Sequence, residues 1–161
     1  MNTRPDFAFV SNHPAHFVAF GFGSGLAPIA PGTAGTLLAI PMYWLIRPQY
    51  RDFEFLLLIV AAFVLGVWAC ARTGRDLGIA DYGGMVWDEI VAFWLVLLIV
   101  PDELLWQLAA FVLFRIFDIV KPQPIRFFDA TLKGGFGVMF DDVIAAFYAL
   151  LVLAIWKFIY P

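Results

Sequence analysis

Residues 55–71 form an unbroken run of uncharged, mostly apolar residues, FLLLIVAAFVLGVWACA. A helix needs about 20 apolar residues to cross a bilayer, and this run approaches that length when one residue is added at each end. The whole chain is 63% hydrophobic and only 14% charged, whereas soluble domains carry about 25% charged residues. A soluble fold of 161 residues would leave much of this apolar surface in water. The sequence therefore predicts a single membrane-embedded domain over residues 1–161.

Four further apolar segments are shorter, and charged residues that could extend them lie at their ends. They cover residues 36–46, 90–100, 104–114 and 143–156. Pro41 should kink the first one, so the stretch at about residues 33–47 either spans the membrane or re-enters it. The pattern predicts an all-α fold, a polytopic membrane helix bundle of about four to five short helices, preceded by an N-terminal tail at about residues 1–17.

Lysine and arginine are distributed unevenly between the two ends of this bundle. If five segments cross, seven basic residues fall on the face that holds the N-terminus and three on the other face. The seven are Arg4, Arg72, Arg75, Arg115, Lys121, Arg126 and Lys133, and the three are Arg47, Arg51 and Lys157. Because cytoplasmic loops carry the excess of positive charge, we expect the first face to be cytoplasmic. The net charge of −3 disfavours nucleic acid as a partner.

Acidic residues collect on the same face, at the ends of the apolar segments: Asp88, Glu89, Asp118, Asp141 and Asp142. Ionisable groups at that depth are costly and usually face a polar interior or a partner. Carboxylates that converge in a small bundle would repel one another, and a divalent cation that prefers oxygen ligands, such as Mg²⁺, relieves the repulsion. A simpler interpretation is that acidic residues mark helix N-termini, but it fails for Asp118, which ends its segment.

Two further features could bind a phosphate at this face. The stretch 21–36, GFGSGLAPIAPGTAGT, is rich in glycine, and backbone N–H groups in such a loop can surround phosphate oxygens while Thr33 or Thr36 reaches phosphate or metal. Three cations could add charge-assisted hydrogen bonds; they are Arg115, Lys121 and Arg126. Each feature also has a structural interpretation, as a membrane-surface turn, an ion pair of Arg115 with Asp118, or contacts to lipid headgroups.

Four stretches carry a resemblance to a known family. In chain order they are GFGSGLAPIAPGTAGT, VWDEIVAFW, FRIFDIVKPQPIRFFD and GGFGVMFDDVIAAF, within about residues 18–150. Their order and spacing resemble the phosphatidylglycerophosphatase A family. The resemblance implies a mainly α-helical, Mg²⁺-dependent enzyme of the bacterial inner membrane, in contact with membrane lipids. Such an enzyme removes the terminal phosphate of phosphatidylglycerophosphate in phospholipid biosynthesis and releases phosphatidylglycerol.

The same resemblance carries site residues over, motif by motif. The first block supplies Gly32 and Thr33, with Thr36 where a small hydroxyl residue is expected. The later blocks supply Asp88, Glu89, Arg115, Asp118, Lys121, Arg126, Asp141 and Asp142. Gln123 stands where the family often has an aromatic residue, which puts headgroup packing rather than chemistry in doubt. Two nucleophiles stay open, a metal-activated water or a carboxylate that forms an acyl phosphate.

A small ion or proton transporter is the alternative, because intramembrane carboxylates also line ion pathways. Such a pathway needs polar residues at mid-membrane depth, and the middles of the segments (FVLGV, WLVLL, LAAFV and YALLV) are apolar. The sequence therefore favours a lipid phosphatase, and it indicates no particular oligomeric state.

Overall fold

A computed structural model describes residues 4–123 and 125–159. Every regular element in these residues is a helix, which confirms the predicted all-α fold. Residues 1–3 of the expected tail and Pro124 of the connection after Lys121 lie outside the described residues.

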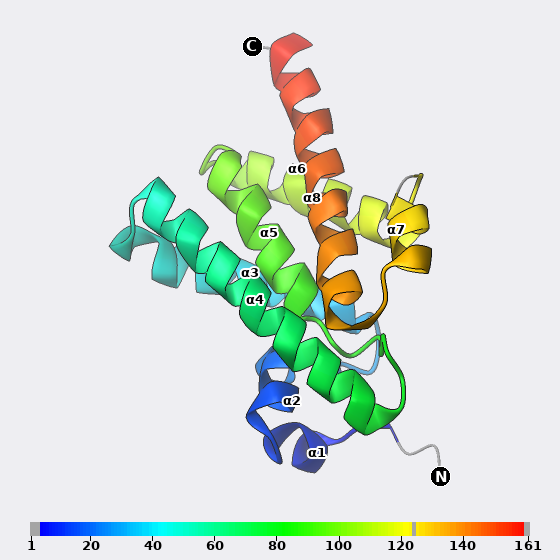
Figure 1. Cartoon of the computed structure of the whole chain (residues 1–161). Coiled ribbons are helices and arrows are strands. Elements are labelled where there is room, and N and C mark those ends of the chain that lie inside the picture. The colour runs from blue at the N-terminus through cyan, green and yellow to red at the C-terminus, as the bar shows by residue number, and fades with distance from the viewer. Residues whose placement is uncertain (1–3, 124, 160–161) are drawn as a thin grey trace.

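The described helices follow one another along the chain with short connections (Figure 1). They are α1 (Phe7–Ser11), α2 (Pro14–Ala19), the 3₁₀ helix η1 (Gly21–Leu26), α3 (Pro31–Ile46), the 3₁₀ helix η2 (Arg47–Gln49), α4 (Asp52–Leu77), α5 (Trp87–Ile99), α6 (Leu104–Val120), α7 (Ile125–Thr131) and α8 (Gly134–Ile159). The five apolar segments of the sequence correspond to α3, α4, α5, α6 and α8, and the N-terminal stretch adds two short helices.

α5 is the central helix of the bundle. It packs against α3, α4 and α8, and most of its residues are buried. Two indole N–H groups fasten it to its neighbours: Trp87 Nε1 donates to the carbonyl oxygen of Ala62 in α4 at 2.9 Å, and Trp94 Nε1 donates to that of Ala39 in α3 at 3.1 Å. The Trp87 contact also fixes the first turn of α5, which carries Asp88 and Glu89.

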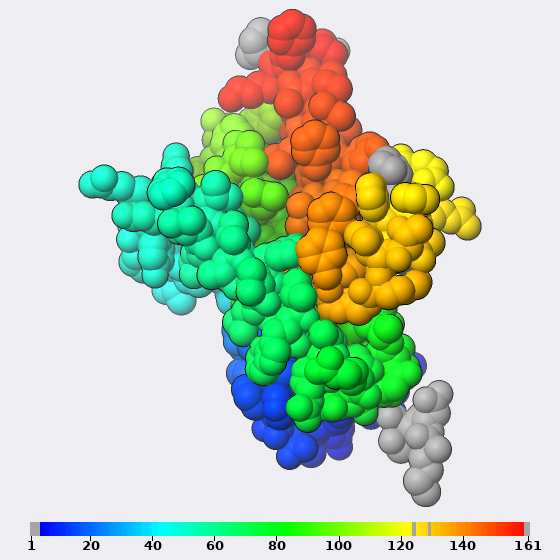
Figure 2. All heavy atoms as spheres, viewed as in Figure 1, coloured from blue at the N-terminus to red at the C-terminus, as the bar shows by residue number. Residues whose placement is uncertain are grey.

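Small residues let α4 and α8 approach closely. A Cβ atom on Gly135 of α8 would lie 2.0 Å from the carbonyl oxygen of Val67 in α4, a contact that real Cβ atoms do not make. Gly66 of α4 is similarly crowded, since a Cβ there would lie 2.4 Å from Sδ of Met139. Figure 2 shows α4 and α8 in contact, with the last turns of α8 projecting beyond the rest of the molecule. The close approach brings the first half of α8 against the start of α5.

Two helices are long and apolar enough to cross a membrane, Asp52–Leu77 and Gly134–Ile159. Both present large exposed apolar side chains, such as Leu57 on α4 and Phe147 on α8. α3, α5 and α6 have 16, 13 and 17 residues, fewer than the roughly 20 of a typical crossing. α3 is one continuous helix through Pro41. The molecule is thus a membrane helix bundle in which two helices meet the criteria for a span.

The N-terminal helices cover the end of α4 and lead toward α5. His16 of α2 lies 2.9 Å from Asp76 (Nε2 to Oδ2), and Arg72 Nε donates to the same carboxylate oxygen at 2.8 Å. Just before α5 begins, the N–H of Val86 donates to the carbonyl oxygen of Ala19 at 2.8 Å. His16 therefore joins α2 to α4 outside the acidic group.

Candidate active site

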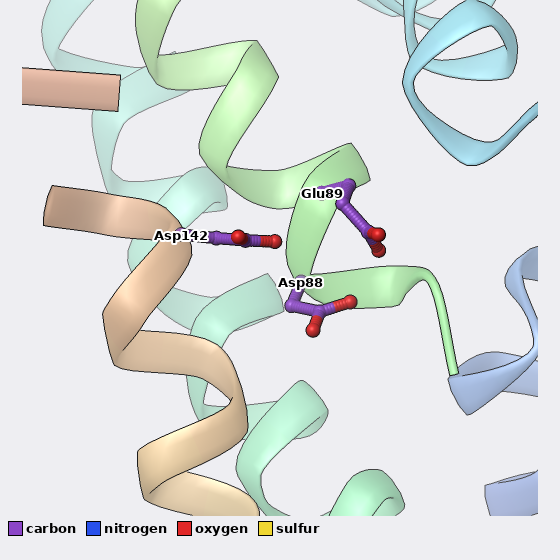
Figure 3. A group of neighbouring side chains, drawn as sticks. All are labelled: Asp88, Glu89 and Asp142. Atoms are coloured by element: carbon purple, nitrogen blue, oxygen red, sulfur yellow. The ribbon is translucent and has the colours of Figure 1, made fainter. Parts of the chain in front are cut away.

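Three carboxylates from two helices meet inside the bundle. Asp88 and Glu89 lie in the first turn of α5, and Asp142 projects from α8 toward them (Figure 3). One oxygen of each lies within 4.8 Å of an oxygen of each of the others. The three residues are only 7%, 9% and 2% exposed, so water screens their mutual repulsion poorly. We call them the acidic triad; they are three of the five acidic residues that the sequence predicted to converge.

The triad fits a divalent metal ion. Asp88 Oδ1 and Glu89 Oε2 are buried and have no hydrogen-bond partner among the described residues. The N-terminus of α5 favours negative charge there, but by only about 0.3–1 kcal/mol per group. Clustered carboxylate oxygens with unused lone pairs are the ligands that Mg²⁺ and Mn²⁺ prefer. A cation of this kind would satisfy both the charge and the unpaired oxygens.

Arg115 brings a positive charge from α6 to the edge of the triad. Its Nη1 atom lies 2.8 Å from Asp118 Oδ2 and 3.6 Å from Glu89 Oε1. The same nitrogen donates to Thr36 Oγ1 at 3.3 Å, while Nε is buried and has no partner among the described residues. The ion pair that the i, i+3 spacing predicted is therefore present, but the arginine also contacts α5 and α3. Asp118 in turn lies beside Asp142, which places it next to the triad.

The N-terminus of α3 points its backbone at the same place. Ala30 adopts a left-handed conformation (φ 48°), Pro31 starts the helix, and no side chain caps its first N–H groups. A Cβ atom on Gly32 would lie 2.1 Å from Glu89 Oε1 and 2.9 Å from Arg115 Nη2. Only glycine lets the helix start come this close to the carboxylate and the guanidinium. An uncapped helix N-terminus beside an arginine is a suitable place for an anion.

The two threonines of this segment differ in their environment. Thr36 is fully buried, and its hydroxyl donates to the carbonyl oxygen of Gly32 at 2.9 Å while it accepts from Arg115. It therefore fixes the relative positions of α3 and the arginine. Thr33 is half-buried in the first turn of α3. Of the two, Thr33 has the more accessible side chain for a bound phosphate.

The second predicted cation, Lys121, is paired with Asp141. Lys121 Nζ lies 2.5 Å from Asp141 Oδ2, and the aspartate side chain is buried while the lysine is half-buried. Lys121 follows the last residue of α6 in a left-handed conformation (φ 44°). Arg126, in contrast, lies in α7 with an exposed side chain.

Sequence reasoning missed Tyr148, which also fixes this connection. Its hydroxyl donates to the carbonyl oxygen of Gln123 at 3.2 Å, and its ring packs against that of Phe117 with 5.5 Å between centroids. Tyr148 follows Asp141 by seven residues, so both lie on one face of α8. That spacing was the signal in the sequence that could have revealed it.

Comparisons with known proteins identify a family and several relatives. Residues 17–157 match the family described as phosphatidylglycerophosphatase A. A protein of that name from Haemophilus influenzae is 48% identical over 147 residues, covering 88% of this chain and 87% of the relative. A protein of the same name from Escherichia coli is 43% identical over 136 residues, covering 83% and 78%. All the site residues discussed above fall within the matched range.

A third relative has a different name. A putative phosphatidylinositol-3-phosphatase from Bacteroides thetaiotaomicron is 43% identical over 150 residues, covering 88% of this chain and 92% of the relative. No solved structure matches the chain significantly. The relatives therefore share the description of a lipid phosphatase but not of one substrate.

Proposed function

Because the chain belongs to the phosphatidylglycerophosphatase A family, we propose that this phosphatase converts phosphatidylglycerophosphate to phosphatidylglycerol and phosphate in phospholipid biosynthesis. The observation that carries the proposal is the meeting of three buried carboxylates with Arg115 and the uncapped start of α3. Membership of an enzyme family also favours the phosphatase over the transporter alternative.

The acidic triad would hold Mg²⁺, and Asp118 and Asp141 are further candidate ligands from the sequence. When bound, this ion would offset charge on the phosphomonoester and activate a water molecule. The unpaired oxygens Asp88 Oδ1 and Glu89 Oε2 support the assignment, because no described group of the protein satisfies them. With the phosphate in place, one carboxylate accepts the proton of the attacking water, which is the nucleophile that we favour over a carboxylate.

Positive groups around the triad would bind the phosphate oxygens. Arg115 and Lys121 can donate charge-assisted hydrogen bonds, and the first N–H groups of α3, with the Thr33 hydroxyl, add neutral donors. Arg126 is a candidate contact for the headgroup from the exposed side of α7. Attack in line with the glycerol oxygen breaks its bond to phosphorus, and that oxygen takes up a proton as phosphatidylglycerol leaves.

The enzyme would be a multi-pass protein of the bacterial inner membrane with its site facing the cytoplasm. Two helices with the length and hydropathy of membrane spans support the membrane location. The excess of basic residues on the face that holds the site supports the orientation. The lipid's acyl chains would stay among apolar helices while the headgroup reaches the triad.

The relative named as a putative phosphatidylinositol-3-phosphatase supports a second candidate substrate, another lipid phosphomonoester. Both lipids present a phosphate monoester on a diacylglycerol-based headgroup, so the same carboxylates and cations could act on either. A substrate panel that contains both lipids separates the two assignments.

The direct test is phosphate release from phosphatidylglycerophosphate by the purified protein in proteoliposomes, with Mg²⁺ or with EDTA. We expect Mg²⁺-dependent release, and we expect Asp88→Asn to lower kcat by at least about 100-fold, as when a preorganised charged group is lost from an active site. Asp102→Asn is the matched control, because Asp102 is exposed in the connection after α5, at the end opposite the triad.

Two outcomes would count against the proposal in different ways. Full activity in EDTA, or near wild-type turnover of Asp88→Asn, would reject the metal site at the triad. Phosphate release from phosphatidylinositol 3-phosphate but not from phosphatidylglycerophosphate would reject the substrate and leave the phosphatase site in place.

A further inference from the structure

The adjacent residues Asp141 and Asp142 point at different partners. Successive side chains on an α-helix are about 100° apart around the axis, so two neighbours can face different helices. Asp142 faces the start of α5 and belongs to the acidic triad (Figure 3). Asp141 faces the end of α6, where its Oδ2 atom lies 2.5 Å from Lys121 Nζ.

The backbone around Lys121 is arranged to make this contact. α6 ends at Val120, and Lys121 itself takes a left-handed conformation that non-glycine residues rarely adopt. Pro122 follows and cannot continue the helix. Tyr148, on the same face of α8 as Asp141, holds the carbonyl oxygen of Gln123. One face of α8 therefore fixes both the lysine and the connection that follows it.

The charges near the triad suggest why the lysine is held in this way. Arg115 is paired with Asp118, and Lys121 is paired with Asp141. Of the five acidic residues that the sequence predicted to converge, the other three form the triad, and two of these have an oxygen without a partner among the described residues. Arg115 also lies 3.6 Å from Glu89 of the triad, and Lys121 is bound to Asp141, the residue next to Asp142. Lys121 is half-buried in its pair, so its ammonium group can contact a second anion at the site.

We propose that Asp141 is a positioning residue, which holds Lys121 toward the phosphate of the substrate, and that Asp142 of the acidic pair is the one that serves the metal ion. This assignment rests on the proposed lipid phosphatase function. It gives two adjacent aspartates different roles. Loss of Asp142 weakens metal binding, whereas loss of Asp141 weakens phosphate binding.

The test compares Asp141→Asn with Lys121→Met, the double variant, Asp142→Asn and the distant control Lys157→Met. For each, KM and kcat for phosphatidylglycerophosphate are measured at saturating Mg²⁺, together with the Mg²⁺ concentration for half-maximal activity. We expect Asp141→Asn and Lys121→Met each to raise KM about 10-fold, the effect of one lost charge-assisted hydrogen bond. The double variant should be no worse than the poorer single variant, because both remove the same contact. Asp141→Glu should recover part of the loss.

Thermal unfolding gives a readout that does not need turnover. Mg²⁺ alone should raise Tm of wild type and Asp141→Asn equally but not that of Asp142→Asn. Inorganic phosphate added with Mg²⁺ should raise Tm further in wild type and much less in Asp141→Asn and Lys121→Met. Lys157→Met should behave like wild type in both titrations.

The assignment is overturned if Asp141→Asn needs more Mg²⁺ or loses the Mg²⁺-induced shift, because Asp141 would then serve the metal. It is also overturned if Asp141→Asn lowers Tm but leaves KM and the phosphate shift unchanged, because the pair would then be only structural. If wild type hydrolyses neither lipid, the proposed function fails, and the two thermal titrations still decide the role of Asp141.

Discussion

Replacing Gly32 by alanine tests whether a glycine is needed at this position by the active site or by the helix. Gly32 lies in the first turn of α3 with ordinary helical geometry, and alanine is favoured over glycine in helices by about 1 kcal/mol. Local propensity alone therefore predicts that Gly32→Ala stabilises the protein. The surroundings of Gly32 predict a loss of activity, because the new Cβ atom would lie 2.1 Å from Glu89 Oε1 and 2.9 Å from Arg115 Nη2.

The size of the effect follows from these distances. Ordinary contact with a Cβ atom begins at 3.4 Å, so Glu89 or the start of α3 must move until the 2.1 Å separation has grown by more than 1 Å. A misplacement of about 1 Å in a catalytic arrangement can cost about 100-fold in rate. We expect Gly32→Ala to lose about 100-fold in kcat/KM, measured as phosphate release from phosphatidylglycerophosphate. We expect Tm to stay within a few degrees of that of wild type.

Gly83→Ala is the control, because a Cβ atom at Gly83 meets no atom within 4 Å. Gly83 lies in the connection between α4 and α5. It should retain full activity. If Gly32→Ala kept wild-type kcat/KM, the start of α3 could not lie as close to Glu89 as described, and its proposed part in phosphate binding would be wrong.

Asp118→Asn should lower phosphate release about 10- to 100-fold, since Arg115 loses its 2.8 Å partner beside the triad; unchanged turnover would show that Asp118 neither orients the arginine nor serves the metal. Gly135→Leu should lower the stability of the detergent-purified protein by about 1–3 kcal/mol or more, because a side chain there meets the α4 backbone and overpacks the α4–α8 contact; a Tm equal to that of wild type would mean that the two helices lie further apart.

Much of the fold follows from the sequence because apolar segment length is a local property. The uncharged run at residues 55–71 predicted a membrane-length helix, and α4 contains it. The helix is longer than the run, from Asp52 to Leu77. Arg72 and Asp76 stay within it because they lie at its surface and pair with each other. The charged flank thus extended the helix instead of ending it.

The N-terminal stretch was less predictable. Residues 7–19 lack a continuous apolar run, yet they form α1 and α2. Helices this short gain most of their stability from packing rather than from their own propensity. Here the packing is against the end of α4, with the contact of His16 to Asp76, 60 residues further along the chain. No local pattern reveals a contact of that separation.

The sequence by itself determined that this chain is an all-α bundle with its acidic and basic residues near the ends of apolar segments. It could do so because hydropathy and charge are properties of the individual side chains. It could not distinguish Asp141 from Asp142, or Thr33 from Thr36, since each pair consists of the same side chain in similar surroundings along the chain. The tertiary structure decided between them, because the direction in which each side chain leaves its helix selects a neighbouring helix. Asp142 meets α5 and Asp141 meets the end of α6. That choice depends on how α5, α6 and α8 pack together, which no single segment specifies.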